Sequence, residues 1–222
     1  MAPLDRSFLI WGGGGHGKVV ADAIRAGGDH VLGFIDADPE KLGTVVEPGG
    51  AKIVHLEADW GIEIGGPLSL PAGADGIVVA LGDGRRRLEI VLKLGDLGAP
   101  AVVHPAAVVS PSAEIGRGSV VFAGAVVNSA ARIGRAVIIN SAAVVEHDCE
   151  VADGAHVSPG AVLSGGVSLG ARSWIGSGAI VIHRIRIGAD VVVGAGGVVI
   201  DDLPDGAKVG GVPARPLGSG RA

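Results

Sequence analysis

An aliphatic residue recurs at every sixth position through the second half of the chain. The series runs from Val103 to Val199, and all seventeen of its positions hold Val, Ile or Leu. A small residue commonly follows four positions later, and glycine often follows the aliphatic residue directly, as in Ile115-Gly116 and Ile175-Gly176. Each unit of six therefore predicts one short strand with an inward aliphatic side chain and one tight corner.

Three such units close one coil, and successive coils hydrogen-bond to each other at the strand spacing of about 4.8 Å. Residues 103–199 are long enough for roughly five coils. An ordinary β-sandwich would instead alternate polar and apolar positions, with turns every 8–12 residues or so. The unbroken period of six favours a left-handed parallel β-helix of hexapeptide repeats over residues 102–200.

The outward strand positions, compared at eighteen-residue spacing, give three walls of different character. The first wall is aliphatic and holds Val108, Val126, Val144, Val162, Ile180 and Val198. The second wall is polar and holds Glu114, Arg132, Glu150, Ser168 and Arg186. The third wall is apolar except for one histidine and holds Val120, Ile138, His156, Trp174 and Val192. Since monomers rarely leave so large an apolar stripe in water, two apolar walls predict a homotrimer whose clefts combine groups from two subunits.

The first hundred residues alternate between strand and helix patterns, which predicts a small Rossmann-like parallel sheet. We expect strands at 8–11, 31–35 and 77–81 and helices at 18–25 and 85–97. The predicted domains are thus a Rossmann-like domain at 1–101, a β-helix at 102–200 and a C-terminal tail at 201–222.

A glycine-rich loop, Gly12-x-Gly14-x-x-Gly17, lies between the first strand and the first helix, and Asp36 follows nineteen residues later. Glycines at this spacing let the backbone approach a diphosphate at a helix N-terminus. We therefore expect an anionic nucleotide here; the alternative is a merely tight turn. NAD is disfavoured, because about 100 residues hold too little sheet for a full Rossmann fold. ATP hydrolysis is also disfavoured, because Val19 stands where a P-loop needs Ser or Thr.

Composition narrows the function classes. The chain has 40 glycines, 3% aromatic residues and no Tyr, so its core must be built from small and β-branched side chains. The net charge of -5 argues against a nucleic-acid partner. Mean hydropathy is +0.49, yet no run of 18 apolar residues occurs, so we expect no membrane insertion. One cysteine and no evident signal peptide in residues 1–20 predict a cytoplasmic protein.

One predicted corner of the β-helix holds candidate catalytic residues. His147 and Asp148 occupy it, and the corner positions one coil later are Gly165 and Gly166. An imidazole beside a carboxylate, below two glycines, suits a general base with an orienting partner; the alternative is a solvated turn histidine. His156 faces outward from its strand, where it touches a ligand or a neighbouring subunit; the alternative is simple packing. We expect His16 to cap the glycine loop.

A metal site and a nucleophilic cysteine are both disfavoured. His183 lies on the same corner as His147 but two coils away, at roughly 10 Å by the ladder spacing, which is too far to share one ion. Cys149 occupies an inward small position and is expected to fill the core.

Four segments occur in an order typical of one family: Gly12 to Lys18, Ala80-Leu81-Gly82-Asp83, Val145 to Cys149, and Gly211-Val212-Pro213-Ala214-Arg215. Together they resemble the PglD/NeuD-type sugar acyltransferases, and most of all the branch that N-acetylates GDP-perosamine. The resemblance extends over nearly the whole chain.

The resemblance implies that this chain transfers acetyl from acetyl-CoA to the 4-amino group of a nucleotide-linked amino sugar, without a metal. His147 would be the base and Asp148 its partner. The implied substrate-binding residues are Gly14, Gly15, His16, Asp36 and Gly82. The implied cofactor-binding residues are His156, Gly165, Ser177 and Ala195. A sugar O-acetyltransferase of the sialic-acid type and a non-catalytic β-helical assembly subunit remain as alternatives.

Overall fold

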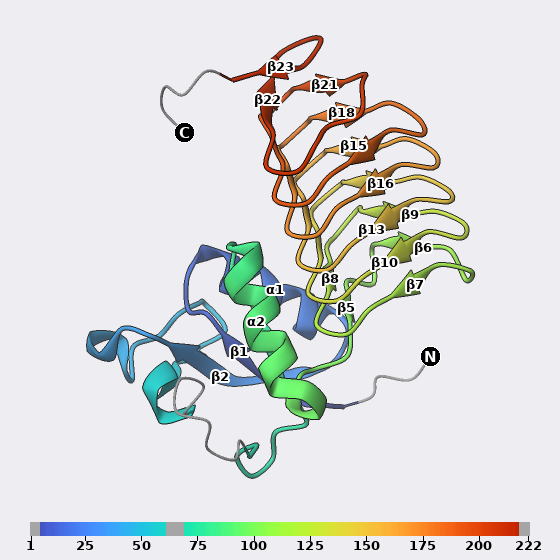
Figure 1. Cartoon of the computed structure of the whole chain (residues 1–222). Coiled ribbons are helices and arrows are strands. Elements are labelled where there is room, and N and C mark those ends of the chain that lie inside the picture. The colour runs from blue at the N-terminus through green and yellow to red at the C-terminus, as the bar shows by residue number, and fades with distance from the viewer. Residues whose placement is uncertain (1–4, 61–68, 218–222) are drawn as a thin grey trace. The chain divides into compact units, whose positions relative to one another are not determined.

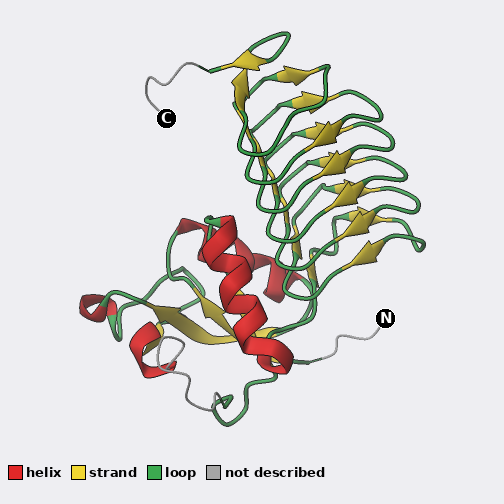
Figure 2. Ribbon diagram, viewed as in Figure 1, coloured by secondary structure: helices red, strands yellow, loops and turns green. Residues whose placement is uncertain are grey.

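The computed structural model describes residues 5–60 and 69–217, which form two compact units, Met1–Pro105 and Ala106–Ala222 (Figure 1). Residues 218–222 of the predicted tail and residues 1–4 of the predicted first domain lie outside the described residues. Helices occur in the first unit, whereas the described part of the second unit consists of strands and turns (Figure 2).

The first unit is a parallel four-stranded sheet with the order β3-β2-β1-β4. Its strands are β1 Ser7–Trp11, β2 His30–Asp36, β3 Ile53–Leu56 and β4 Gly76–Val79. Its helices are α1 Gly15–Ala26 and α2 Gly84–Leu94, with short 3-10 turns η1 Pro39–Lys41, η2 Glu57–Trp60 and η3 Gly95–Leu97. The strand–helix alternation confirms the predicted Rossmann-like sheet.

Two details of this unit differ from the sequence expectation. Helix α1 begins at Gly15, three residues before the predicted start, so the last glycines of the loop form its first turn. Strand β3 was not predicted; it is only four residues long and pairs with β2 alone. Every side chain from Phe8 to Trp11 is buried, and the Trp11 Nε1 donates to Glu57 Oε2 at 3.2 Å.

The remaining strands form a left-handed parallel β-helix with three sheets. The first sheet has the order β21-β18-β15-β12-β9-β6: Val198–Val199, Ile180–Val181, Val162–Leu163, Val144–Val145, Val126–Val127 and Val108–Val109. The second has the order β19-β16-β13-β10-β7: Arg186–Ile187, Ser168–Leu169, Glu150–Val151, Arg132–Ile133 and Glu114–Ile115. The third has the order β23-β22-β20-β17-β14-β11-β8-β5: Arg215–Pro216, Lys208–Gly210, Val192–Val193, Trp174–Ile175, His156–Val157, Ile138–Ile139, Val120–Val121 and Val102–Val103.

The register of the coils is the predicted one. From β6 to β21, parallel pairing joins each strand residue to the one eighteen positions later, for example Ile138 to His156 and His156 to Trp174. The second residue of the strands is the aliphatic member of the repeat, and from Val121 to Val199 these side chains are buried. The predicted fold class is thus confirmed, from the hexapeptide period to the inward aliphatic ladder.

Residues after Val199 continue the coil, although they were expected to form a tail. Strand β22 pairs in parallel with β20, Leu203 bridges to Ile187, and β23 folds back antiparallel onto β22. The β-helix therefore has one further coil and a short hairpin at its C-terminal end.

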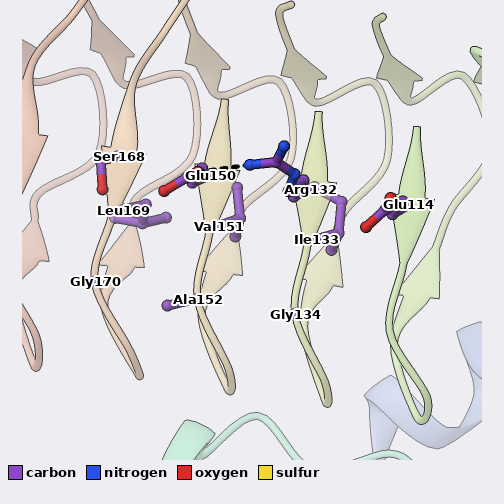
Figure 3. A pocket seen from close by; sticks show the side chains of 10 residues that line it. All are labelled: Glu114, Arg132, Ile133, Gly134, Glu150, Val151, Ala152, Ser168, Leu169 and Gly170. Atoms are coloured by element: carbon purple, nitrogen blue, oxygen red, sulfur yellow. Dashed lines mark hydrogen bonds and ion pairs between the residues drawn. The ribbon is translucent and has the colours of Figure 1, made fainter. Parts of the chain in front are cut away.

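The three walls differ in exposure within one chain. The second wall is solvated, as predicted; Arg132 pairs there with Glu150 at 3.0 Å beside a shallow hollow of about 310 Å³ (Figure 3). On the first wall Val108 is 64% exposed and Ile180 is 41% exposed, so aliphatic surface faces outward. On the third wall Val120 and Ile138 are buried, whereas Trp174 is exposed. In the described ranges, no helix combines the length and apolarity needed to cross a bilayer.

Gly17 tests the tight entry into helix α1. A Cβ at this position would collide with the carbonyl oxygen of Gly12, whereas a Cβ at Gly15 would meet no atom within 4 Å. We predict that Gly17→Ala lowers the free energy of unfolding by about 1–3 kcal/mol, as overpacking does. The control Gly15→Ala should leave stability unchanged or raise it by up to about 1 kcal/mol. Urea unfolding of both variants measures the difference, and equal stabilities would contradict the close approach.

Candidate active site

The C-terminal ends of β1 and β4 form the first part of the site. These two strands are neighbours in the sheet, and each leads directly into a helix, α1 or α2. The β1–α1–β2 unit extends the sheet to one side of β1, and β4 lies on the other side. Ligands of open α/β sheets bind at such a switch point, outside the carboxyl ends of the strands.

Three predicted substrate-binding glycines lie at this edge and leave room for a ligand. A Cβ built on Gly14, Gly15 or Gly82 would meet no other atom within 4 Å. Gly14 is the N-cap of α1 and supplies no side-chain cap, so the first N–H groups of the helix are not capped by their own N-cap residue. This combination of backbone donors, helix dipole and open space suits an anionic group.

Asp36, at the end of β2, organises the same loop. Its Oδ2 accepts the Gly13 N–H at 3.1 Å, and its Oδ1 accepts the Asp38 N–H at 3.0 Å. Burial alone would raise the pKa of this carboxyl, but the hydrogen bonds from Asp38, Lys41 and Gly13 outweigh burial and lower it. Asp36 is therefore ionised at neutral pH and ties the loop to β2.

Arg87 is a member of this region that the sequence analysis missed. It is buried, and its Nη1 donates to the carbonyls of Leu81 and Gly82 at 2.7 and 3.0 Å. Burial lowers the pKa of the guanidinium to about 10, although the Asp83 charge opposes this effect. The signal was present: Arg87 shares the apolar face of α2 with Ile90, Val91 and Leu94.

His16 lies in the first turn of α1, at the predicted position beside the loop. Burial, followed by the positive charge of Arg87, lowers its pKa to about 4. The imidazole is therefore neutral at physiological pH and can serve a ligand only as a neutral donor or acceptor.

The corner between β12 and β13 holds the predicted His–Asp pair. His147 Nδ1 lies 2.7 Å from Asp148 Oδ2, and the two side chains are 62% and 69% exposed. An ionised carboxylate only accepts hydrogen bonds, so Nδ1 carries the donated proton and Nε2 is the basic nitrogen. Asp148 has φ +59, a left-handed conformation that Asp tolerates better than most residues.

Gly165 lies against the imidazole from the next coil. A Cβ at this position would be 2.6 Å from His147 Nε2 and 2.7 Å from Cε1. The Gly166 N–H donates to the His147 carbonyl at 2.9 Å, which fixes the two corners in register. The space above His147 is thus not empty, as the sequence suggested, but holds its own ring, and a side chain at position 165 would displace that ring from this position.

His156 belongs to a second cluster, on the third wall. Its Nε2 lies 3.1 Å from Asn140 Nδ2, and its ring stacks on Trp174 with centroids 5.9 Å apart and planes 3° apart. Trp174 Nε1 in turn donates to Ser158 Oγ at 2.6 Å. Asn140, Ser158 and Trp174 were not assigned to a site from sequence, because only the folded coil brings them together.

Ser177 and Ala195 are exposed at the corner between the third and first walls, one coil apart. Gly196 N–H donates to the Ser177 carbonyl at 2.9 Å. His147 and Gly165 occupy a different corner, between the first and second walls. A single chain therefore distributes the predicted catalytic and cofactor residues over two edges of the prism, separated by the first wall.

The described residues indicate neither a nucleophilic cysteine nor a metal site. Cys149 is buried beside the Ser164 carbonyl, and burial raises the pKa of its thiol, as befits a core residue. Within residues 5–60 and 69–217, no group of three His, Cys, Asp or Glu side chains is arranged to hold a metal ion. A hexapeptide-repeat β-helix with a His–Asp pair at an exposed corner, preceded by a Rossmann-like sheet, is typical of the hexapeptide-repeat acyltransferases.

Comparison with known proteins identifies the family. Residues 7–94 match the PglD N-terminal domain. The acetyltransferase domain of PglB from Neisseria gonorrhoeae FA1090 is 39% identical with a TM-score of 0.84, over 96% of this chain and 100% of that one. PerB from Caulobacter crescentus, solved with CoA and GDP-perosamine, is 41% identical with a TM-score of 0.83, over 96% and 97%. WeeI from Acinetobacter baumannii AYE is 26% identical with a TM-score of 0.78, over 96% and 100%.

A search of curated proteins gave no match. The family model and the solved relatives together show that the chain belongs to the PglD-type family of acetyl-CoA-dependent sugar acetyltransferases.

The charge state of His16 can be measured directly. We predict that its imidazole stays neutral down to a pKa of about 4 in histidine NMR titrations. Arg87→Gln should raise this pKa, because it removes a neighbouring positive charge, whereas the control Arg85→Gln on the exposed side of α2 should not. Since the unfolded chain protonates His16 near its ordinary value of 6.5, stability should fall as the pH drops from 6.5 towards 4. A His16 that titrates near 6.5 in the folded protein would refute the burial argument.

Proposed function

We propose that this protein transfers acetyl from acetyl-CoA to the 4-amino group of a nucleotide-linked amino sugar, GDP-perosamine or a UDP-4-amino sugar, with His147 as general base. The observation that carries the proposal is the corner pair: an exposed imidazole that is oriented by Asp148 and lies against Gly165. Support also comes from PerB, which is 41% identical and was solved with CoA and GDP-perosamine.

The chemistry follows from the arrangement at His147. The sugar ammonium must lose a proton before its nitrogen can attack the thioester carbonyl, and Nε2 accepts that proton. Asp148 stabilises the imidazolium through the Nδ1 hydrogen bond. Backbone N–H groups of the coil stabilise the oxyanion of the tetrahedral intermediate. After attack the nitrogen still carries one proton too many, and this proton is released to solvent as the amide forms. When the C–S bond breaks, the imidazolium gives the first proton to the departing CoA thiolate. No acyl-enzyme forms, because the amine attacks the thioester directly.

The nucleotide of the sugar is assigned to the first unit. The N–H groups at Gly14 and Gly15 suit the diphosphate, and the open backbone at Gly82 leaves room for it. Asp36 is ionised and suits a hydroxyl or a base edge, while His16 offers a neutral contact.

Acetyl-CoA is assigned to the β-helix, along His156, Gly165, Ser177 and Ala195. Gly165 lies on one edge of the chain, Ser177 and Ala195 lie on another, and His156 lies on the third wall. A complete cofactor site therefore needs an edge from each of two subunits. The aliphatic first wall and the exposed part of the third wall at Trp174 supply surfaces for that association, which favours a homotrimer. Val120 and Ile138 of the third wall are already buried within one chain and do not contribute.

An assay of thiol release tests the function. Wild-type protein is incubated with acetyl-CoA and a panel of GDP- and UDP-linked amino sugars, and with free sialic acid as the acceptor for O-acetylation. We predict turnover with a nucleotide-linked 4-amino sugar, and a loss of about 10²–10⁴-fold for His147→Asn.

The control is His183→Asn, an exposed histidine on the same corner two coils away, which should retain full turnover. Acceptance of sialic acid alone would replace the proposal with O-acetylation. Wild-type turnover by His147→Asn would show that His147 is not the general base.

The oligomer has its own test. We predict that Val144→Asp combined with Val162→Asp on the first wall dissociates the protein and abolishes turnover, although neither residue does chemistry. Ser168→Asp on the solvated second wall is the control and should change neither property. Analytical ultracentrifugation with parallel assays measures both; a fully active wild-type monomer at micromolar concentration would contradict the shared site.

A further inference from the structure

The side chains around His156 on the third wall determine the tautomer of its imidazole. Asn140 Oδ1 accepts the N–H of Ser141 at 2.8 Å, which fixes the orientation of the amide. The amide nitrogen therefore faces His156, at 3.1 Å from Nε2. Because an amide nitrogen only donates, Nε2 must accept, and the proton of the neutral ring lies on Nδ1.

Trp174 fixes the plane of the same ring. The two residues are register partners in adjacent strands, β14 and β17, and their rings lie nearly parallel. The indole is held in turn by the hydrogen bond from Nε1 to Ser158 Oγ, and Ser158 is buried. The chain thus anchors the indole in the wall and uses its face to support the imidazole.

Core packing does not explain this tryptophan. The chain has only three tryptophans, and this one is 51% exposed on an outer wall. The inward residue of the same strand, Ile175, already fills the core at this level. Asn140 and Ser158 occupy equivalent positions of adjacent coils, eighteen residues apart, and one holds the imidazole while the other holds the indole.

We propose that Trp174 is a positioning residue for the acetyl-CoA site: anchored by Ser158, its indole holds the His156 imidazole in the orientation in which Asn140 selects the Nδ1–H tautomer. This inference rests on the proposed function, which places His156 along the cofactor. Trp174 acts through His156, and Asn140 and Ser158 act through hydrogen bonds to the two rings.

The test separates ring geometry from catalysis. Nitrogen-15 NMR of histidine-labelled protein, without substrate, distinguishes a protonated Nδ1 from a protonated Nε2. We expect a single Nδ1–H tautomer for His156 in the wild type, and exchange between tautomers in Trp174→Ala. Trp174→Phe keeps a flat ring against the imidazole and should keep the tautomer, and Ser158→Ala should give an intermediate result. Circular dichroism and thermal unfolding establish that each variant retains the β-helix.

Kinetics supplies the second readout. Trp174→Ala should lower kcat/KM for acetyl-CoA by about 10–100-fold, the scale of a small misplacement, whereas Trp174→Phe should stay within about threefold. His156→Ala combined with Trp174→Ala should lose little more than His156→Ala alone, because both changes act on one group.

Three results would overturn the positioning role. They are an unchanged His156 tautomer in Trp174→Ala, turnover by that variant close to wild type, and multiplicative losses in the double variant. Failure of the proposed function gives a different result. The wild type would then not transfer acetyl, whereas the NMR spectrum would still show the single Nδ1–H tautomer of His156.

Discussion

The β-helix depends on one backbone requirement, a left-handed residue at its corners. From Gly118 to Gly196, positive φ recurs every six residues, at seven glycines and at seven residues that are Ala, Asp or Arg. Each of these seven non-glycine residues adopts the left-handed conformation at a cost of about 1 kcal/mol or more.

 The non-glycine residues of this series are Ala130, Ala136, Ala142, Asp148, Arg172, Arg184 and Asp190. Asp148 is therefore both a corner residue and the partner of His147. The turn that builds the coil also brings the carboxylate to the imidazole.

The second consequence of the corners is the ladder, which places residues eighteen positions apart side by side. Ser119 and Ser173 use it to join adjacent coils: each hydroxyl donates to a carbonyl of the neighbouring coil and accepts an N–H from it. Arg172 pairs with Asp190 at 2.6 Å by the same spacing, although a partly exposed pair adds little stability. The candidate site uses this ladder as well, since it sets Gly165 against His147 and Trp174 against His156.

The period of six was enough to predict the coil, its register and the corner that holds His147, because each of these depends on local repetition. It failed where the repetition changes. In the last coil the spacing falls from eighteen to sixteen residues, as the pairing of Val192 with Lys208 shows, so a count in sixes lands on Asp205 and misses the final strand. Arg87 was missed for another reason: its place among the apolar positions of α2 marks it as buried, but its partners are backbone carbonyls of the β4–α2 loop, which no side chain in the sequence signals.

The placement of the candidate residues bears on why such an enzyme would assemble. His147 lies at the edge between the first and second walls, and Ser177 lies at the edge between the third and first walls. No rearrangement of one rigid prism can bring two of its edges together, whereas a second copy can present the opposite edge. The contact that results joins unlike surfaces, and such a head-to-tail contact either closes into a ring or grows without limit. In the proposed homotrimer, the ring closes after three copies and the charged second wall is left to solvent. On the proposed function, assembly is then part of the chemistry, because each ring closure completes a cofactor site that one chain only half supplies.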